Sequence, residues 1–488
     1  MMWMILLCIA VTSCAHAASL GDNGPTMFDT IVIGMGASGT TAATILARAG
    51  KKVLGLEAQD RIGGRVNTVP LGDGVVELGA EWIHGQYPSR VYDLAVQNGI
   101  PLVSQDISME VYRSDGTKSD KELINELVEF ALAVSDDPPE EAQPLGEFIT
   151  SRVMDYIKER HPKLLDDKDF INEFLSFLDL VVDNYEATTS WNDITTDSKY
   201  TELDGDAHLS WHRLGYKTLF DILLNTHNNG TGLPNLQYRL NTEVTQIKYS
   251  DEPNQRVEVT CKDGSVYTAD NVVVTVSVGV LKERYTTLFL PPLPPKKVKA
   301  IKDIKMGLTG KIILEFPTRW WGDVYILCFL WRGLDKMSVE DKLWTNIVEA
   351  STPMGSNRVL TVWVVGDNMI LIEKLPDEVV KTKVMELLRR FMGANVTIPE
   401  PVKMLRSYWH TNPYTRGAYT FDDVLSPQHP NARSDLAAPL KDSAGQLKVL
   451  FAGEATNTIH FSTVHGAVET GHREAMRILS NTKISSKL

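Results

Sequence analysis

The sequence predicts an α/β fold whose first domain is built around a parallel sheet. The apolar, β-rich run at residues 28–33 is typical of a buried strand. A glycine-rich turn, a helix-favouring stretch at 41–49 and a second strand-like run at 52–57 follow it. A strand, a helix and a strand in this order form the unit from which parallel sheets are made.

The rest of the chain indicates a second, α+β domain made of discontinuous segments. Residues 118–163 have a helical, strongly charged pattern, and 379–392 is also helical. Strand patterns occur at 237–249, 257–261, 272–276, 311–316, 359–365 and 449–454. The proline cluster 291–295 indicates a crossing between domains. We expect a first domain of residues 27–95, 233–300 and 431–482, a second domain of 96–232 and 301–430, a leader of 1–18 and a tail of 483–488.

The turn after the first strand contains a nucleotide-binding pattern. Gly34, Gly36 and Gly39 form G-x-G-x-x-G between a predicted strand and a predicted helix. The first glycine permits the tight turn, the second admits a pyrophosphate and the third lets helix and strand pack closely. Glu57 ends the second strand, where a carboxylate accepts hydrogen bonds from ribose hydroxyls. The first domain is therefore predicted to be a Rossmann-type dinucleotide-binding domain.

Charge and length limit the partners. The 488 residues include 49 basic and 62 acidic side chains, a formal net charge of −13. This balance argues against nucleic acid as a partner because phosphate backbones would be repelled. It suits a polycation, although simple solubility also explains it. The richest apolar run after the leader, 272–281, is too short to span a bilayer, so we expect no stable membrane span.

The two ends of the chain suggest different locations. No charged residue precedes Asp22, and the apolar run 3–11 is followed by the small-residue site Ala15–Ala17, as in a secretory signal peptide. The chain ends in Ser486-Lys487-Leu488, which is a peroxisomal address. We expect secretion, because signal insertion acts before the carboxyl end is made. The peroxisome is the alternative.

Further motifs extend the nucleotide pattern over nearly the whole chain. A second glycine pair lies in Arg61–Arg65, Glu77–Ala80 follows it, and 451–456 and 464–467 stand near the carboxyl end. Together these segments resemble the flavin amine oxidase superfamily in content and order. The resemblance implies FAD as the cofactor. It implies these FAD-binding residues besides the three glycines and Glu57: Arg65, Val244, Trp409, Glu454 and Val464.

Three stretches resemble the polyamine oxidase branch of that superfamily. They are 79–85, which contains His84, 310–317, which contains Lys311, and 461–466, which contains Thr463. The resemblance implies a catalytic role for Lys311 and His84, and contact of Glu186, Tyr419 and Thr463 with substrate. No metal site is expected. Four of these residues also have a structural interpretation: Lys311 as a solvated strand lysine, His84 as a satisfied histidine, Tyr419 as a core tyrosine and Glu186 as a surface carboxylate.

The resemblance implies oxidation of a polyamine such as spermine, or an N1-acetylated relative, by O2. The products are an aldehyde, a shorter amine and hydrogen peroxide. The monoamine branch attaches its flavin to a cysteine near the carboxyl end, and no cysteine follows Cys328 here, so FAD should be bound noncovalently. Alternatives are an L-amino-acid oxidase, a lysine demethylase, or a flavin-fold binding protein without catalysis.

Overall fold

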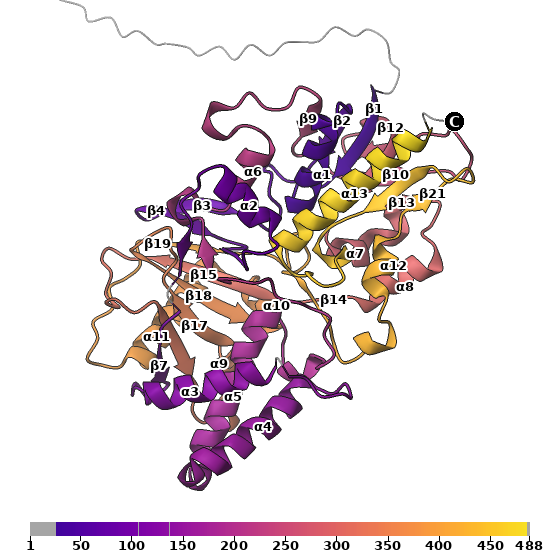
Figure 1. Ribbon diagram of the computed structural model, residues 1–488. Helices are drawn as coiled ribbons and strands as arrows, with labels where there is room; N and C mark the ends of the chain where they lie inside the picture. The colour runs from indigo at the N-terminus through magenta and orange to yellow at the C-terminus, as the bar shows by residue number, and fades with distance from the viewer. Residues whose placement is uncertain (1–25, 106, 136, 486–488) are drawn as a thin grey trace, which may run out of the picture.

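The computed structural model describes residues 26–485 except residues 106 and 136. The predicted leader and the Ser486–Leu488 tripeptide lie outside the described residues. Figure 1 shows two large sheets, one in the upper and one in the lower half of the molecule, with helices packed around each. This arrangement confirms the expected α/β fold class, with a Rossmann-type sheet and a second, mainly antiparallel sheet.

The first sheet is parallel at its centre. β1 (Thr26–Ile33) lies between β2 (Val53–Leu56) and β12 (Val266–Val274) and runs parallel to both. Two further parallel strands extend it: β9 (Leu236–Arg239) beside β2, and β22 (Leu447–Phe451) beside β12. The other members are β10 (Val244–Lys248), β11 (Val257–Cys261), β13 (Phe289–Leu290) and β21 (Leu440–Lys441).

The predicted strand at 237–249 is in fact two strands that lie far apart in the sheet, β9 at one end of the strand order and β10 next to last at the other. β9 and β10 are separated by a turn in which Asn241 has a φ of +52°. Asparagine adopts this left-handed conformation more readily than most residues. The predicted helical block also divides, into α3 (Lys121–Val134) and α4 (Leu145–Arg160), with Pro138 and Pro139 between them.

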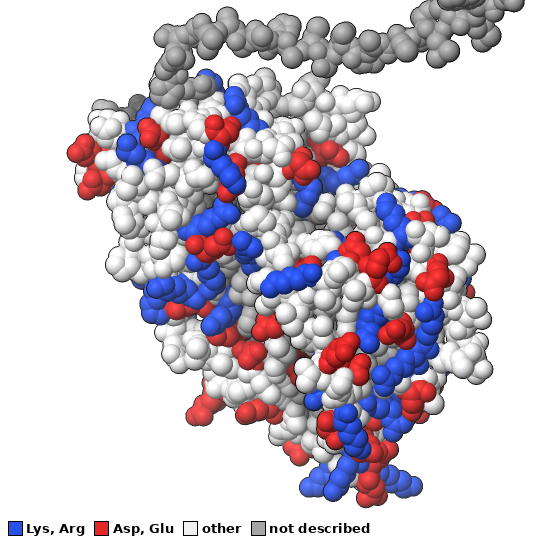
Figure 2. Space-filling model, turned by 180° about the vertical axis from the view of Figure 1, so that it is seen from behind, with Lys and Arg blue, Asp and Glu red and all other residues white. Residues whose placement is uncertain are grey.

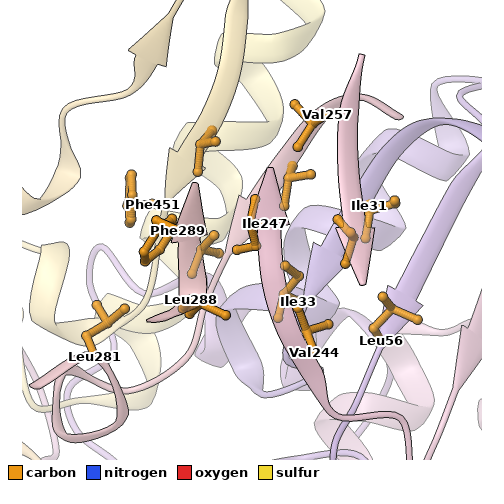
Figure 3. Close-up of a cluster of buried hydrophobic side chains, with 14 of the residues drawn as sticks. Ile31, Ile33, Leu56, Val244, Ile247, Val257, Leu281, Leu288, Phe289 and Phe451 are labelled. Atoms are coloured by element: carbon orange, nitrogen blue, oxygen red, sulfur yellow. The ribbon is translucent and has the colours of Figure 1, made fainter. Parts of the chain in front are cut away.

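Two helices cover one face of the first sheet. Near its two ends the described chain forms α1 (Ala37–Arg48) and α13 (Val464–Ser485), which pack against each other. The opposite face carries a core of aliphatic and aromatic side chains, including Ile31, Ile33, Val244 and Phe451 (Figure 3). The sheet is thus buried on both sides, as its near-continuous apolar strands predict.

The second sheet has the order β19-β15-β18-β17-β16-β7. Its strands are β19 (Lys403–Arg406), β15 (Thr309–Glu315), β18 (Val359–Val365), β17 (Ile347–Ser351), β16 (Ile326–Leu330) and β7 (Met109–Arg113). On one face it packs against α11 (Asp377–Met392), and on the other against α3, α4 and α5 (Lys168–Glu186). Among the described residues, no helix combines the length and the apolar character needed to cross a membrane.

Short elements connect the two sheets. The hairpin β3 (Thr68–Leu71) and β4 (Gly74–Glu77) precedes β5 (Trp82–Ile83), which pairs with β8 (Leu209–Ser210). The other short helices and strands are α2 (Arg90–Gln97), β6 (Val103–Ser104), α6 (Thr218–Leu223), α7 (Val278–Leu288), α8 (Pro295–Asp303), β14 (Lys305–Met306), α9 (Val339–Lys342), α10 (Asn368–Ile372), β20 (Thr420–Phe421) and α12 (Ala432–Ala437). Of the predicted site residues, Arg65 lies just before the β3–β4 hairpin and His84 directly follows β5.

Candidate active site

The amino end of α1 forms a cradle of backbone groups. Gly34 has a φ of +91°, which favours glycine, and a Cβ on Gly39 would lie 1.9 Å from the carbonyl oxygen of Gly34. Gly39 therefore permits the close packing of helix and strand. Gly36 is the N-cap of α1, and no side chain caps the helix there. A Cβ on Gly36 would meet only the Gly63 carbonyl oxygen, at 3.7 Å, so the space above the helix start is open.

Glu57, which directly follows β2, is hydrogen-bonded to this turn. Glu57 is buried, and its carboxylate accepts hydrogen bonds from the backbone N–H of Met35 at 2.8 Å and of Gln59 at 2.9 Å. Burial raises the pKa of Glu57, while these hydrogen bonds oppose the rise. The second glycine pair lies alongside, because Gly63 N–H donates to the Met35 carbonyl oxygen. Both predicted nucleotide motifs therefore meet at one end of the sheet.

Arg65 and Glu454 join three distant parts of the chain. The Arg65 guanidinium donates to a Glu454 carboxylate oxygen at 2.9 Å and to the Ala418 carbonyl oxygen at 2.8 Å. The other Glu454 oxygen accepts from the Thr420 hydroxyl at 2.7 Å and from the Ser462 N–H at 3.0 Å. Burial would raise the pKa of Glu454, but the positive charge of Arg65 is the main reason that it is lowered. Glu454 thus stays an anion that holds Arg65 in place.

The other predicted FAD-binding residues lie in the same region. Val244 begins β10, and its side chain lies near Ile33 and Leu56 in Figure 3. Trp409 is buried against Gly79, and Val464 is the first residue of α13. The FAD-binding roles of Val244, Trp409 and Val464 stay predictions.

Lys311 points into the protein and is almost completely buried. Its ammonium donates to the carbonyl oxygens of Glu77 at 3.1 Å and Gly79 at 2.9 Å, and to the Glu81 carboxylate at 2.7 Å. These three acceptors match the three protons of an ammonium group. The nitrogen also lies 4.3 Å from the centre of the Trp363 ring. If Lys311 holds a water during turnover, that water must replace one of these acceptors.

Several side chains at and beside the carboxyl end of α5 keep accessible surface although protein groups surround them. Tyr185 is 59% exposed, but burial, with a smaller contribution from Glu349, raises its pKa to about 12. Glu186 is half-buried, and burial first, then the charge of Asp422, raises its pKa to about 7. The Tyr419 hydroxyl donates to the backbone carbonyls of Asn184 at 3.1 Å and Tyr185 at 3.2 Å. From accessible surface combined with strong desolvation we infer that Tyr185, Glu186 and Tyr419 border one internal space at the carboxyl end of α5.

His84 contributes a neutral imidazole to the same region. Burial lowers the pKa of His84 to about 4, and the nearby His208 adds to the effect. Its ring lies 6.2 Å from that of Trp82 and 6.5 Å from that of His208. The buried His465, in the first turn of α13, is close enough to His84 for each charge to affect the other, and its Nε2 has no hydrogen-bond partner among the described residues. An uncharged His84 does not repel a cationic ligand.

Thr463 occupies the start of α13. Its hydroxyl donates to the His460 carbonyl oxygen at 2.8 Å and accepts from the Gly466 N–H at 3.0 Å. This is an N-capping contact, and it stabilises the helix end that carries Val464 and His465. Contact of Thr463 with substrate stays a prediction.

Residues 37–479 match the family described as flavin containing amine oxidoreductase. The chain belongs to this family. It is 31% identical to the peroxisomal N(1)-acetyl-spermine/spermidine oxidase of Bos taurus, over 92% of this chain and 94% of the relative. It is 30% identical to polyamine oxidase 3 of Oryza sativa subsp. japonica, over 95% and 93%. It is also 30% identical to lysine-specific histone demethylase 1 homolog 2 of the same rice, over 93% of this chain and 58% of that protein.

Membership of the flavin amine oxidoreductases implies FAD, and the residues present fit it. The uncapped start of α1 offers free N–H groups and a positive dipole end to a pyrophosphate. Gly36 leaves room for close approach, and Glu57, held by the Met35 N–H, is the residue that would bind the ribose. The unpartnered Nε2 of His465 adds a polar atom at the start of α13.

The sequence motifs did not single out every side chain of this flavoprotein site. Glu81 pairs with Lys311, and Trp363 faces the Lys311 ammonium. His208 packs its ring near that of His84, and Tyr185 is strongly desolvated. Glu81 lies inside the motif 79–85, so one acid in an otherwise apolar and aromatic stretch was a usable signal. The position of Trp363 follows only from the pairing of β15 with β18.

Proposed function

We propose that this flavin amine oxidoreductase oxidises polyamines with O2, using noncovalently bound FAD, and releases an aldehyde, a shorter amine and hydrogen peroxide. The observation that carries the proposal is the internal space inferred at the carboxyl end of α5. Its lining combines the aromatic rings of Tyr185 and Tyr419 with the carboxylate of Glu186. Aromatic rings and unpaired acids suit a long, flexible cation. The polyamine oxidases among the relatives support the same substrate class.

The residues of the site would bind and orient such a substrate. The flavin, when bound, supplies the oxidation of the carbon–nitrogen bond. The reacting nitrogen must be neutral, and a desolvated space favours loss of its proton. Neutral His84 adds no repelling charge, while Glu186 can hold a nitrogen that stays protonated. Lys311 would position a water near the reacting atoms by exchanging one of its three acceptors.

Surface charge is consistent with a role for the interior rather than the surface in attracting the cation. Figure 2 shows acidic and basic side chains interspersed over one face of the molecule. The net charge of −13 is therefore not concentrated into one acidic field on that face. Selectivity for a polyamine should come from the internal space.

Peroxide release across a set of amines tests the proposed function. The set should contain spermine, spermidine, their N1-acetylated forms, a simple monoamine, an L-amino acid and a methylated lysine peptide. We expect peroxide from at least one polyamine, and little from the last three compounds. Turnover of the L-amino acid or the methyl-lysine peptide alone would overturn the polyamine assignment.

The mode of flavin attachment can be tested separately. We expect the purified protein to be yellow and to release all of its flavin on acid precipitation. Of the described cysteines, Cys261 and Cys328 are both buried, and burial raises the pKa of each thiol, so neither is a ready nucleophile. Absorbance spectra of supernatant and washed pellet give the result. Flavin that stays with the pellet would show a covalent bond.

For localisation, we propose cleavage near Ala17 or Ala18 and export of the mature chain. Fluorescently tagged full-length chain should reach the medium, and a form without the leader should not. A form without Ser486–Leu488 should behave like the full-length chain. Punctate organelles that disappear on removal of this tripeptide, with the leader intact, would favour the peroxisome instead.

A further inference from the structure

Glu349 lies in one row with Lys311 across the second sheet. In the pairing of β15 with β18, Lys311 is opposite Trp363, and in the pairing of β18 with β17, Trp363 is opposite Glu349. Directly opposed residues place their side chains on the same face of a sheet. Neighbouring strands are about 4.8 Å apart, so the Cα atoms of Lys311 and Glu349 are separated by roughly 10 Å.

The Glu349 carboxylate has no hydrogen bond or ion pair with another described residue. Lys311, the cation at the other end of the row, forms its ion pair with Glu81. Trp363 donates its indole N–H to the Ser351 hydroxyl. Burial, and then the negative charge of Glu81, raise the pKa of Glu349 to about 7. A desolvated carboxylate without a partner is costly even when it is half-buried, and a ligand cation would remove that cost.

Glu349, on β17 (Ile347–Ser351), lies near the end of α5 that carries Tyr185 and Glu186. It is half-buried, and its charge contributes to the raised pKa of Tyr185, so the phenol and the carboxylate are close. Tyr185 precedes Glu186 at the end of α5, and α5 packs against β17. The two acids therefore offer two separate points for positive charge beside the aromatic rings.

We propose that Glu349 binds a charged nitrogen of the substrate, at a distance from the nitrogen that is oxidised, and thereby selects amines with several cationic groups. The inference rests on the proposed polyamine oxidation. It assigns Glu349 to binding, about two strands away from Lys311, and gives it no part in the chemical step. Glu349 should not strengthen the binding of amines that lack the distant positive charge.

The test compares Glu349→Gln with wild type in the holoenzyme. Anaerobic stopped-flow measurement of flavin reduction yields the dissociation constant and the limiting reduction rate separately. With the best polyamine, we expect the dissociation constant to rise at least tenfold and the limiting rate to stay within about threefold. With an amine of the same length that lacks the distant charge, both values should be unchanged. Glu315→Gln is the matched control. Glu315 is on β15 of the same sheet, but its Oε1 already pairs with Nη2 of Arg358 at 3.6 Å.

A second measurement avoids turnover. With the flavin reduced chemically under argon, the polyamine should raise the melting temperature of wild type and of Glu315→Gln more than that of Glu349→Gln. Equal dissociation constants and equal thermal shifts in all three proteins would overturn the role of Glu349. A wild-type enzyme whose flavin no polyamine reduces would instead refute the proposed function, so the two failures are distinguishable.

Discussion

Replacing Lys311 by methionine should slow turnover on the order of a hundredfold, the usual effect of losing one well-placed polar group in a closed site. Methionine keeps the length and the apolar stem but removes the ammonium that contacts Glu77, Gly79 and Glu81. FAD should still bind, because the glycine cradle at α1 is unchanged. The slowed step should be one that uses an ordered water, such as reaction of the reduced enzyme with oxygen.

The substitution also leaves Glu81 without its partner. Removing one partner of a buried ion pair costs about 3–5 kcal/mol of stability, so the lower stability of the variant contributes to its loss of turnover. The double variant Lys311→Met/Glu81→Gln removes the uncompensated charge and should recover stability but not rate. Stopped-flow spectroscopy separates flavin reduction by spermine from reoxidation by O2. Wild-type rates for both half-reactions in Lys311→Met would show that this lysine is structural.

Replacing Gly36 by valine should give a folded protein without flavin. The φ of Gly36 is −76°, which any residue adopts, and a Cβ there meets no atom closer than 3.7 Å. The protein alone therefore leaves space next to Gly36, but a valine side chain would occupy the space that the pyrophosphate needs. The ratio of flavin to protein should fall close to zero while circular dichroism stays like that of wild type.

Gly39→Ala is the contrasting variant. Its Cβ would lie 1.9 Å from the Gly34 carbonyl oxygen, so helix and strand must move apart and the domain should lose stability outright. Full flavin occupancy in Gly36→Val would mean that the pyrophosphate does not lie at the start of α1. A stable, flavin-loaded Gly39→Ala would contradict the packing role of that glycine.

Local patterns were enough to predict how the first sheet begins. The strand, glycine turn, helix and second strand at residues 28–57 fold as expected, because each step is a short-range preference. The motifs that resemble the flavin amine oxidases also predicted the family. The break between β9 and β10 was missed, because a single asparagine in a left-handed turn leaves the strand-like pattern on both sides intact.

The internal space could not be predicted from the sequence. The resemblance to the polyamine oxidases singled out Lys311, but its partners Glu77, Gly79 and Glu81 are more than two hundred residues away. Glu349 and Trp363 reach the same row only through the register of β15, β18 and β17. Strand register depends on the whole sheet, and no local motif encodes it.

Anaerobic mixing of the purified holoenzyme with spermine, and in parallel with its N1-acetylated form, tests the central claim most directly. Polyamine oxidation predicts that the flavin absorbance near the visible maximum bleaches with at least one of them, that admission of O2 restores it, and that one equivalent each of aldehyde and hydrogen peroxide forms per cycle. A flavin that stays oxidised with every polyamine, but bleaches with an L-amino acid or a methylated lysine peptide, would contradict it.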